Sequence, residues 1–170
     1  EPAIDYVVMK IPRWPFDKFV SASRILGTQM KATGEVMAIG SSIEAALMKA
    51  LRSLEIGVCT LEQDIYKEID TESIEKKLSD VNDERLFVIA EALRRNITTE
   101  RISSITGIDL FFVNKIKNLV MMEEELKKFT SGTITGDMLR KAKAMGFPDE
   151  AIARFIGSDR KTVKMMRKNL

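Results

Sequence analysis

Histidine is absent from this sequence of 170 residues, and cysteine occurs only once, at Cys59. The absence of histidine excludes Ser-His-Asp and Cys-His catalysis, the HExxH metalloprotease motif and histidine-containing zinc sites. A single cysteine excludes an internal disulfide and the zinc and iron–sulfur sites that need several thiolates. No DxDxDG-type cation loop and no GxxxxGK[ST] phosphate-binding loop occur either. These absences make the chain a poor candidate for an independent enzyme.

Long apolar runs are also missing, so the sequence contains no candidate membrane span and no signal peptide. The net charge of +2 is too close to zero to indicate that the whole chain binds nucleic acid or an anionic membrane. A lone thiol fits a reducing compartment, and we expect a cytoplasmic location. Hydrophobic residues make up 45% of the chain, enough to bury a core in one domain or two small ones. Because the chain starts with Glu1 and not with Met, we expect a piece of a longer protein.

The most informative stretch is residues 31–57, KATGEVMAIGSSIEAALMKALRSLEIG, which is typical of a strand, a turn and a helix. Residues 36–38, flanked by glycines, predict a short buried strand. Ser41 stands three residues before Glu44, the spacing of a capping box. Apolar residues then recur at helical spacing, and Gly57 is the predicted stop of the helix.

Upstream, the alternation of Ile4, Tyr6 and Val8 with the residues between them predicts a strand. This strand should end at about Ile11, because Pro12 has no N–H to donate to a ladder. One helix and two or three strands cannot bury both faces of a sheet, so we expect this part to lean on a larger domain encoded before it.

An aromatic cluster follows at Trp14, Phe16 and Phe19, and residues 20–30 predict a loop or a short helix. The cluster fits a plug that closes the edge of the sheet. A stacking site for a base or a guanidinium is the alternative.

The rest of the chain predicts helices after a connector at 58–70, which has one helical turn near its middle. Arg94-Arg95 should complement the dipole at the end of one helix. The longest helix should run to about Phe129, with residues 123–125, all Glu, on a solvated face. The predicted helix starts are marked by capping residues: Asp70 or Thr71, Asn82 or Asp83, Thr98 or Thr99, and Asp109.

This helical part repeats itself, because residues 98–118 align without a gap on residues 148–168. Gly107 matches Gly157, and Asp109 matches Asp159. The matched positions build a helix, a glycine turn, a capping aspartate and a second helix, so we predict a duplicated helical hairpin with a shared core. The expected fold is mainly α, with a small N-terminal α+β segment followed by an orthogonal helical bundle that contains two helical-hairpin repeats.

The second copy also resembles a helix-turn-helix whose second helix is basic. The alternative function is therefore a nucleic-acid-binding regulator. Against it, the first copy has Leu110, Phe111 and Phe112 where a recognition helix needs polar groups, and the glutamates at 123–125 would repel phosphate. We expect the basic helix to be a solvated face or a contact surface for acidic partner segments. Its cations are Arg160, Lys161, Lys164, Arg167 and Lys168.

Two pairs of neighbouring apolar residues, Phe111-Phe112 and Met121-Met122, are candidate oligomer contacts. Neighbours on a helix are about 100° apart, so at least one member of each pair must point away from a single apolar face. Exposed, they would suit a self-complementary patch. The alternative is a helix buried on two sides, with all four residues in the core.

The segments EPAIDYVVMKIPRW and TQMKATGEVMAIGSSIEAALMKALRSLE resemble the large subunit of glutamine-hydrolysing carbamoyl-phosphate synthetase, and MKATGEVMAIG is the most distinctive part. The resemblance covers the whole chain, more loosely after Glu55. It implies that residues 1–54 are the C-terminal segment of the carboxyphosphate (ATP-grasp) domain, and that residues 55–170 are the helical oligomerisation domain.

The family makes carbamoyl phosphate from bicarbonate, glutamine-derived ammonia and two ATP, for arginine and pyrimidine synthesis. Its nucleotide and metal ligands lie upstream of this chain, so the resemblance implies no catalytic residue and no cofactor here. ATP with Mg or Mn, and K, would belong to the full enzyme. The implied partners are the rest of the large subunit, the glutaminase small subunit and further copies of the chain, with no nucleic acid and no membrane.

The resemblance also assigns two residues to the wall of the internal conduit that carries carbamate, namely Glu35 and Met30. A walled passage that excludes bulk water suits carbamate, which is labile in water. The alternative for Glu35 is a turn residue after Gly34. The chain itself is expected to connect the catalytic halves and to help large subunits associate, without turnover of its own.

Overall fold

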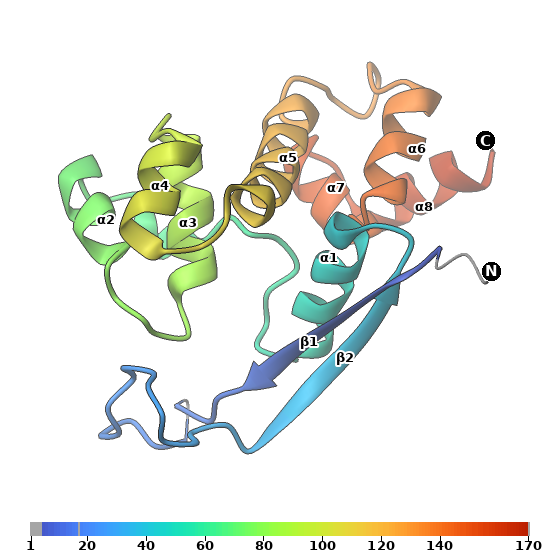
Figure 1. Ribbon diagram of the computed structural model, residues 1–170. Helices are drawn as coiled ribbons and strands as arrows, with labels where there is room; N and C mark the ends of the chain where they lie inside the picture. Colours follow the sequence, from blue (N-terminus) through green and yellow to red (C-terminus); the bar gives the residue numbers. More distant parts are fainter. Residues whose placement is uncertain (1–4, 17, 170) are drawn as a thin grey trace. The chain divides into compact units, whose positions relative to one another are not determined.

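The computed structural model describes residues 5–16 and 18–169, and these are mainly helical, as predicted (Figure 1). The strands and the first helices are β1 (Val7–Arg13), β2 (Gly34–Gly40), α1 (Ile43–Ser53), the short 3₁₀ helix η1 (Asp64–Tyr66), α2 (Thr71–Lys77) and α3 (Arg85–Arg94). The later helices are α4 (Thr99–Thr106), α5 (Leu110–Leu126), α6 (Gly136–Ala144), α7 (Asp149–Phe155) and α8 (Arg160–Lys168). No helix among the described residues is long and apolar enough to cross a membrane.

The chain divides into two compact units, each made of separate stretches of sequence. One unit comprises the residues up to 9, residues 37–60 and the residues from 121 onward. The other comprises residues 10–36 and 61–120. The predicted domain boundary between residues 54 and 55 stays a prediction.

β1 and β2 pair as a two-stranded antiparallel sheet (Figure 1). The half-buried face of β1 carries Val7, Met9 and Ile11. Val8 is exposed, as is Tyr6 just before the strand, and Ile4 lies outside the described residues. The predicted strand is therefore present, but Tyr6 and Val8 are on its exposed side. The prediction that the strand ends before Pro12 was also wrong, because β1 continues to Arg13. An edge strand tolerates proline where its missing N–H would point away from the ladder.

α1 begins one residue later than the capping-box spacing predicted. The side chain of Ser42 accepts a hydrogen bond from the N–H of Ala45 at 3.1 Å, so Ser42 and not Ser41 is the N-cap. The helix ends at Ser53, so the stop predicted at Gly57 was too late. Gly57 instead adopts a φ of 78° in the turn that follows.

The turn after α6 packs closely against α1. Gly146 has a φ of 90°, and a Cβ built on it would lie 3.0 Å from the Cα of Ala45 and 3.0 Å from the Cβ of Met48. Its carbonyl accepts a hydrogen bond of 2.6 Å from Nη1 of Arg52. Phe147 follows and is fully buried. This contact joins α1 to the C-terminal helices of its unit.

In the other unit, α3 packs against α2 and α4. Asp70 caps α2 by accepting from the N–H of Ser73 at 2.9 Å, and Thr98 caps α4, as predicted. The predicted start of α3 was early. Asn82 accepts from the N–H of Glu84 in a turn, and the helix begins only at Arg85.

α5 is the longest helix, as predicted, but it ends at Leu126 and not near Phe129. The prediction that all three glutamates at 123–125 are solvated was wrong for Glu123, which is fully buried. Glu123 shares a helix face with Leu119 and Leu126, at spacings of four and three residues, and both of these are in the core. Glu124 is exposed and pairs with Lys127 at 2.8 Å.

Both predicted hairpins are present, but the first lies mostly in one unit and the second in the other, so their shared core stays a prediction. α4 and α5 are joined through Gly107 (φ 69°), and α7 and α8 through Gly157 (φ 63°). Asp159 accepts from the N–H of Thr162 at the start of α8, and Asp109 accepts from the N–H of Phe111 at the start of α5. The matched core positions have no exposed surface: Ile102 with Ile152, and Val113 with Val163.

Candidate interaction surfaces

The first turn of α5 presents an apolar surface to solvent. Phe111 is 52% exposed and Phe112 is 51% exposed, and Leu110 beside them is also exposed. The two rings contact each other edge to face, with centroids 5.3 Å apart and an interplanar angle of 80°. The ammonium of Lys115 lies 5.4 Å from the centre of the Phe111 ring. We call Leu110, Phe111 and Phe112 the aromatic patch.

A local hydrogen bond fixes where α5 begins. The N–H of Phe111 donates to the carboxylate of Asp109 at 2.8 Å, and this bond fixes the start of the helix. Val113 and Ile116 then occupy the core. Rotation about the helix axis accounts for the exposure of Phe111, which lies about 160° from Val113. It does not account for Leu110 and Phe112, which share helix faces with Val113 and Ile116 at spacings of three and four residues.

The methionine pair is split between the surface and the core. Met121 is 55% exposed, whereas Met122 is only 2% exposed. Of the four candidate oligomer contacts, Phe111, Phe112 and Met121 therefore have surface to offer a partner, and Met122 has almost none.

The two candidate conduit residues lie on the strand β2 and on the segment before it. Glu35 is exposed and pairs with Lys10 of the neighbouring strand β1 at 2.8 Å. Met30 is 85% exposed. Its segment is held by Lys31, whose ammonium donates to the backbone oxygens of Ser23 at 2.8 Å and Ile25 at 2.6 Å.

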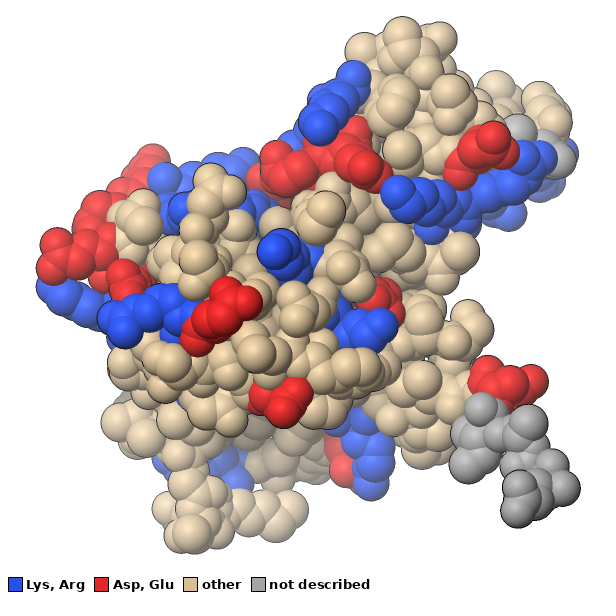
Figure 2. All heavy atoms as spheres, turned by 45° about the horizontal axis from the view of Figure 1, so that its top comes forward, with Lys and Arg blue, Asp and Glu red and all other residues tan. Residues whose placement is uncertain are grey.

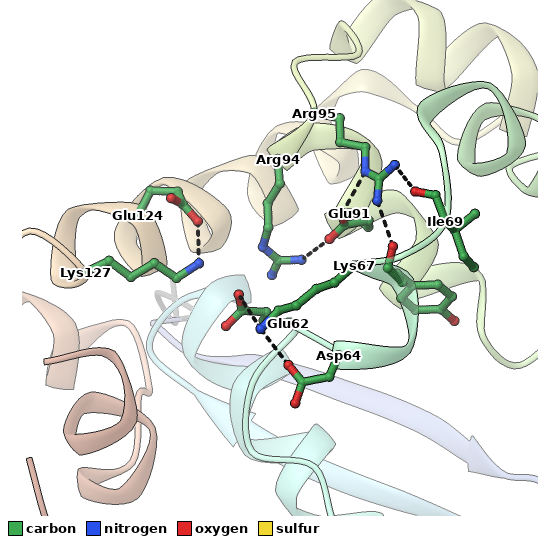
Figure 3. Close-up of polar contacts among 10 residues, drawn as sticks. Glu62, Asp64, Lys67, Ile69, Glu91, Arg94, Arg95, Glu124 and Lys127 are labelled. Carbon is green, nitrogen blue, oxygen red and sulfur yellow. Dashed lines mark hydrogen bonds and ion pairs between the residues drawn. The ribbon is translucent and has the colours of Figure 1, made fainter. Parts of the chain in front are cut away.

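Arg95, the C-cap residue of α3, fastens the connector around η1 to this helix (Figure 3). Nε of Arg95 donates to Glu91 at 2.8 Å, and its two other nitrogens donate to the carbonyls of Tyr66 and Ile69. Arg94 also pairs with Glu91, at 3.2 Å. The spacing of four residues between Glu91 and Arg95 was the signal for this contact in the sequence. Arg95 was assigned from the sequence only to the dipole at the helix end, and this contact was not predicted.

α8 presents a basic surface beside a partly buried carboxylate, that of Asp149. Figure 2 shows Lys and Arg gathered where the C-terminal helices lie. Asp149 at the start of α7 accepts from Lys143 at 2.8 Å and from Arg167 at 3.1 Å. Burial by itself would raise the pKa of Asp149, but the hydrogen bonds from these two cations outweigh burial and lower the pKa.

The hollow next to this carboxylate has a volume of about 450 Å³. Its walls include Arg52, Lys143 and Arg160. Arg52 already donates to two carbonyls and Lys143 to Asp149, and burial lowers the pKa of Arg52. No group of three or more His, Cys, Asp or Glu side chains in the described part of the chain is placed to hold a metal ion.

Comparison with known families decides what kind of molecule carries these surfaces. The family model described as carbamoyl-phosphate synthetase large chain, oligomerisation domain, matches residues 35–170. The chain belongs to this family. The carbamoyl-phosphate synthetase oligomerisation domain is part of an enzyme, and its role is to connect and associate chains of that enzyme. In this oligomerisation domain, the aromatic patch and the basic surface of α8 are therefore candidate contact surfaces.

Proposed function

We propose that this chain is the non-catalytic connecting and oligomerisation region of the large chain of a glutamine-hydrolysing carbamoyl-phosphate synthetase. The full enzyme makes carbamoyl phosphate from bicarbonate, glutamine-derived ammonia and two ATP, for arginine and pyrimidine synthesis in the cytoplasm. ATP, Mg or Mn, K and the glutaminase small subunit belong to that full enzyme. The observation that carries the proposal is an exposed aromatic patch on a member of an oligomerisation family.

The aromatic patch suits self-association for two physical reasons. Burying a half-exposed phenylalanine ring contributes on the order of 1–2 kcal/mol at ordinary transfer coefficients. In addition, the edge-to-face contact between Phe111 and Phe112 holds both rings in place before binding, so little side-chain entropy is lost on association. A surface of this kind on each of two copies forms a self-complementary contact.

Sedimentation velocity at increasing concentrations tests the proposal. The wild-type chain should associate, and Phe111→Ser or Phe112→Ser should weaken association at least about 5-fold, as expected for central aromatic contacts. Phe19→Ser is the matched control, because Phe19 is an exposed phenylalanine (59%) on a different segment. Weakening by Phe19→Ser equal to that by the patch variants would refute the assignment of the patch.

We further infer that Glu35 and Met30 face the conduit for carbamate. The support is the exposed carboxylate of Glu35, held by Lys10, and the exposed side chain of Met30. In the full synthetase, Glu35→Ala should increase the ATP hydrolysed per carbamoyl phosphate formed, because carbamate then escapes into water. Glu124→Ala, which removes another exposed glutamate that is paired with a lysine at 2.8 Å, should leave this ratio unchanged. An unchanged ratio in both variants would overturn the inference.

An assay of phosphate release tests the prediction that the chain alone has no catalytic activity. Incubation with ATP, bicarbonate and ammonia should release no phosphate above background, and clear turnover would overturn the proposal. Strong binding to random duplex DNA, falling steeply with salt, would instead support the alternative of a nucleic-acid-binding regulator.

A further inference from the structure

One face of α8 is cationic along its whole length. Arg160, Lys161, Lys164 and Lys168 lie within about 100° of one another around the helix axis, given 3.6 residues per turn. All four are exposed, and none takes part in an ion pair within the described residues. Arg167, by contrast, is engaged by Asp149. We call these four residues the cationic stripe.

The fold does not require the stripe. The first hairpin places Leu110 and Phe111 where the second places Arg160 and Lys161, although both hairpins bury the same core positions. The two hairpins of one chain therefore have equivalent cores but different surfaces, one aromatic and one cationic. They can make two different contacts.

A surface of opposite charge lies in residues 62–84, which we call the acidic segment. It contains nine Asp or Glu and only three Lys, although Arg24 pairs with Asp83 and Glu84, and Arg101 pairs with Glu75. Figure 2 shows Asp and Glu gathered where α2 lies. Glu68 and Asp80 are exposed and have no ion pair within the described residues. Glu72 is also exposed, with Lys76 beside it at 2.6 Å.

We propose that the cationic stripe of one chain binds the acidic segment of a second copy. This inference rests on the self-association proposed above and adds a second contact to it. The two surfaces differ, and each chain offers both halves of the contact. Complementary charges of this kind speed encounter and fix the orientation of two proteins.

Nucleic acid is the other polyanion that such a stripe could bind. The acidic segment of the same chain repels phosphate, whereas it attracts the stripe of another copy. Met165 borders the stripe and is 54% exposed, which adds an apolar contact that suits a protein surface.

Charge reversal followed by charge exchange tests the contact. We expect Lys161→Glu/Lys164→Glu to weaken self-association about 10-fold at low salt, and Glu68→Lys/Glu72→Lys to do the same, as close interfacial charge pairs do. An equimolar mixture of the two variants should associate within about 3-fold of wild type, because opposite charges then face each other again. The control Lys18→Glu/Lys128→Glu changes the net charge equally, by reversing two exposed lysines elsewhere, and should have little effect.

The outcomes separate this inference from the proposed function. If both charge variants associate like wild type while Phe111→Ser does not, the stripe contact is wrong and the aromatic patch stands. If the control weakens association as much as the stripe variant, net charge and not a specific contact is responsible, and the inference falls. Duplex DNA binding that Lys161→Glu/Lys164→Glu abolishes, with self-association unchanged, would also overturn it. A wild-type chain that is monomeric at every concentration would overturn both proposals.

Discussion

Replacement of Gly146 by alanine is expected to be one of the most damaging small changes in the chain. At a φ of 90° an L-residue is strained, which costs about 1 kcal/mol. The new methyl group would also meet Cα and O of Ala45 and Cβ of Met48, each at 3.0 Å. Two of these are backbone atoms of α1, which cannot move without shifting the helix. Such overpacking costs a further 1–3 kcal/mol or so, and we therefore expect a loss of about 3 kcal/mol in the free energy of unfolding.

Gly157→Ala is the matched control for this prediction. Gly157 has a φ of 63° in the same unit, but a Cβ there would meet nothing within 4 Å. Gly157→Ala should therefore lower the free energy of unfolding by only about 1 kcal/mol, the cost of the strained backbone conformation. Urea unfolding followed by circular dichroism at 222 nm measures both variants. Equal losses in the two would refute the steric argument and the close approach of the turn to α1.

Three further predictions concern single side chains. Ser42→Ala should lower the free energy of unfolding by about 1 kcal/mol, whereas Ser41→Ala should change it by no more than about 0.5 kcal/mol; the reverse order would show that the cap is misassigned. Arg95→Ala should cost about 2 kcal/mol, because it leaves the carbonyls of Tyr66 and Ile69 without this donor and Glu91 with Arg94 as its remaining cation, and a loss below about 0.5 kcal/mol in thermal unfolding would contradict this. The folded pKa of Asp149 is lowered, so its contribution is present above the unfolded pKa near 3.8 and is lost as pH falls through the folded pKa. Asp149→Asn should therefore be less stable than wild type at pH 7, with the difference disappearing in acid, and a pH-independent difference would exclude the ionised pair.

The duplicated hairpin could be predicted from the sequence because its signals are local. A glycine that must adopt positive φ and an aspartate that caps the next helix recur at the same offset, and both are short-range requirements of the chain. The helix ends were less predictable. Ser41 and Ser42 are neighbours with the same capping chemistry, and only the path of the turn decides between them.

The errors concerned residues whose environment is set by tertiary structure. A run of three glutamates looks solvated, but Glu123 lies on the side of α5 that the core covers. Pro12 looks like the end of a strand, but a two-stranded sheet has open edges that accept it. Neither the burial of Glu123 nor the exposure of both rings at Phe111 and Phe112 is encoded in local pattern.

The contact surfaces themselves were predictable only in part. The four candidate residues came from the rule that helix neighbours diverge, and that rule does not say which member of each pair is exposed. The reach of Arg95 to the carbonyls of Tyr66 and Ile69 depends on where the connector runs, which sequence spacing does not give.

Sedimentation of the wild-type chain over a wide range of concentrations tests the central claim most directly. An oligomerisation domain with an exposed aromatic patch should show a weight-average mass that rises with concentration above that of one chain, and Phe111→Ser should shift the rise to higher concentration. A mass that stays at one chain throughout, with the fold intact by circular dichroism, would contradict the account.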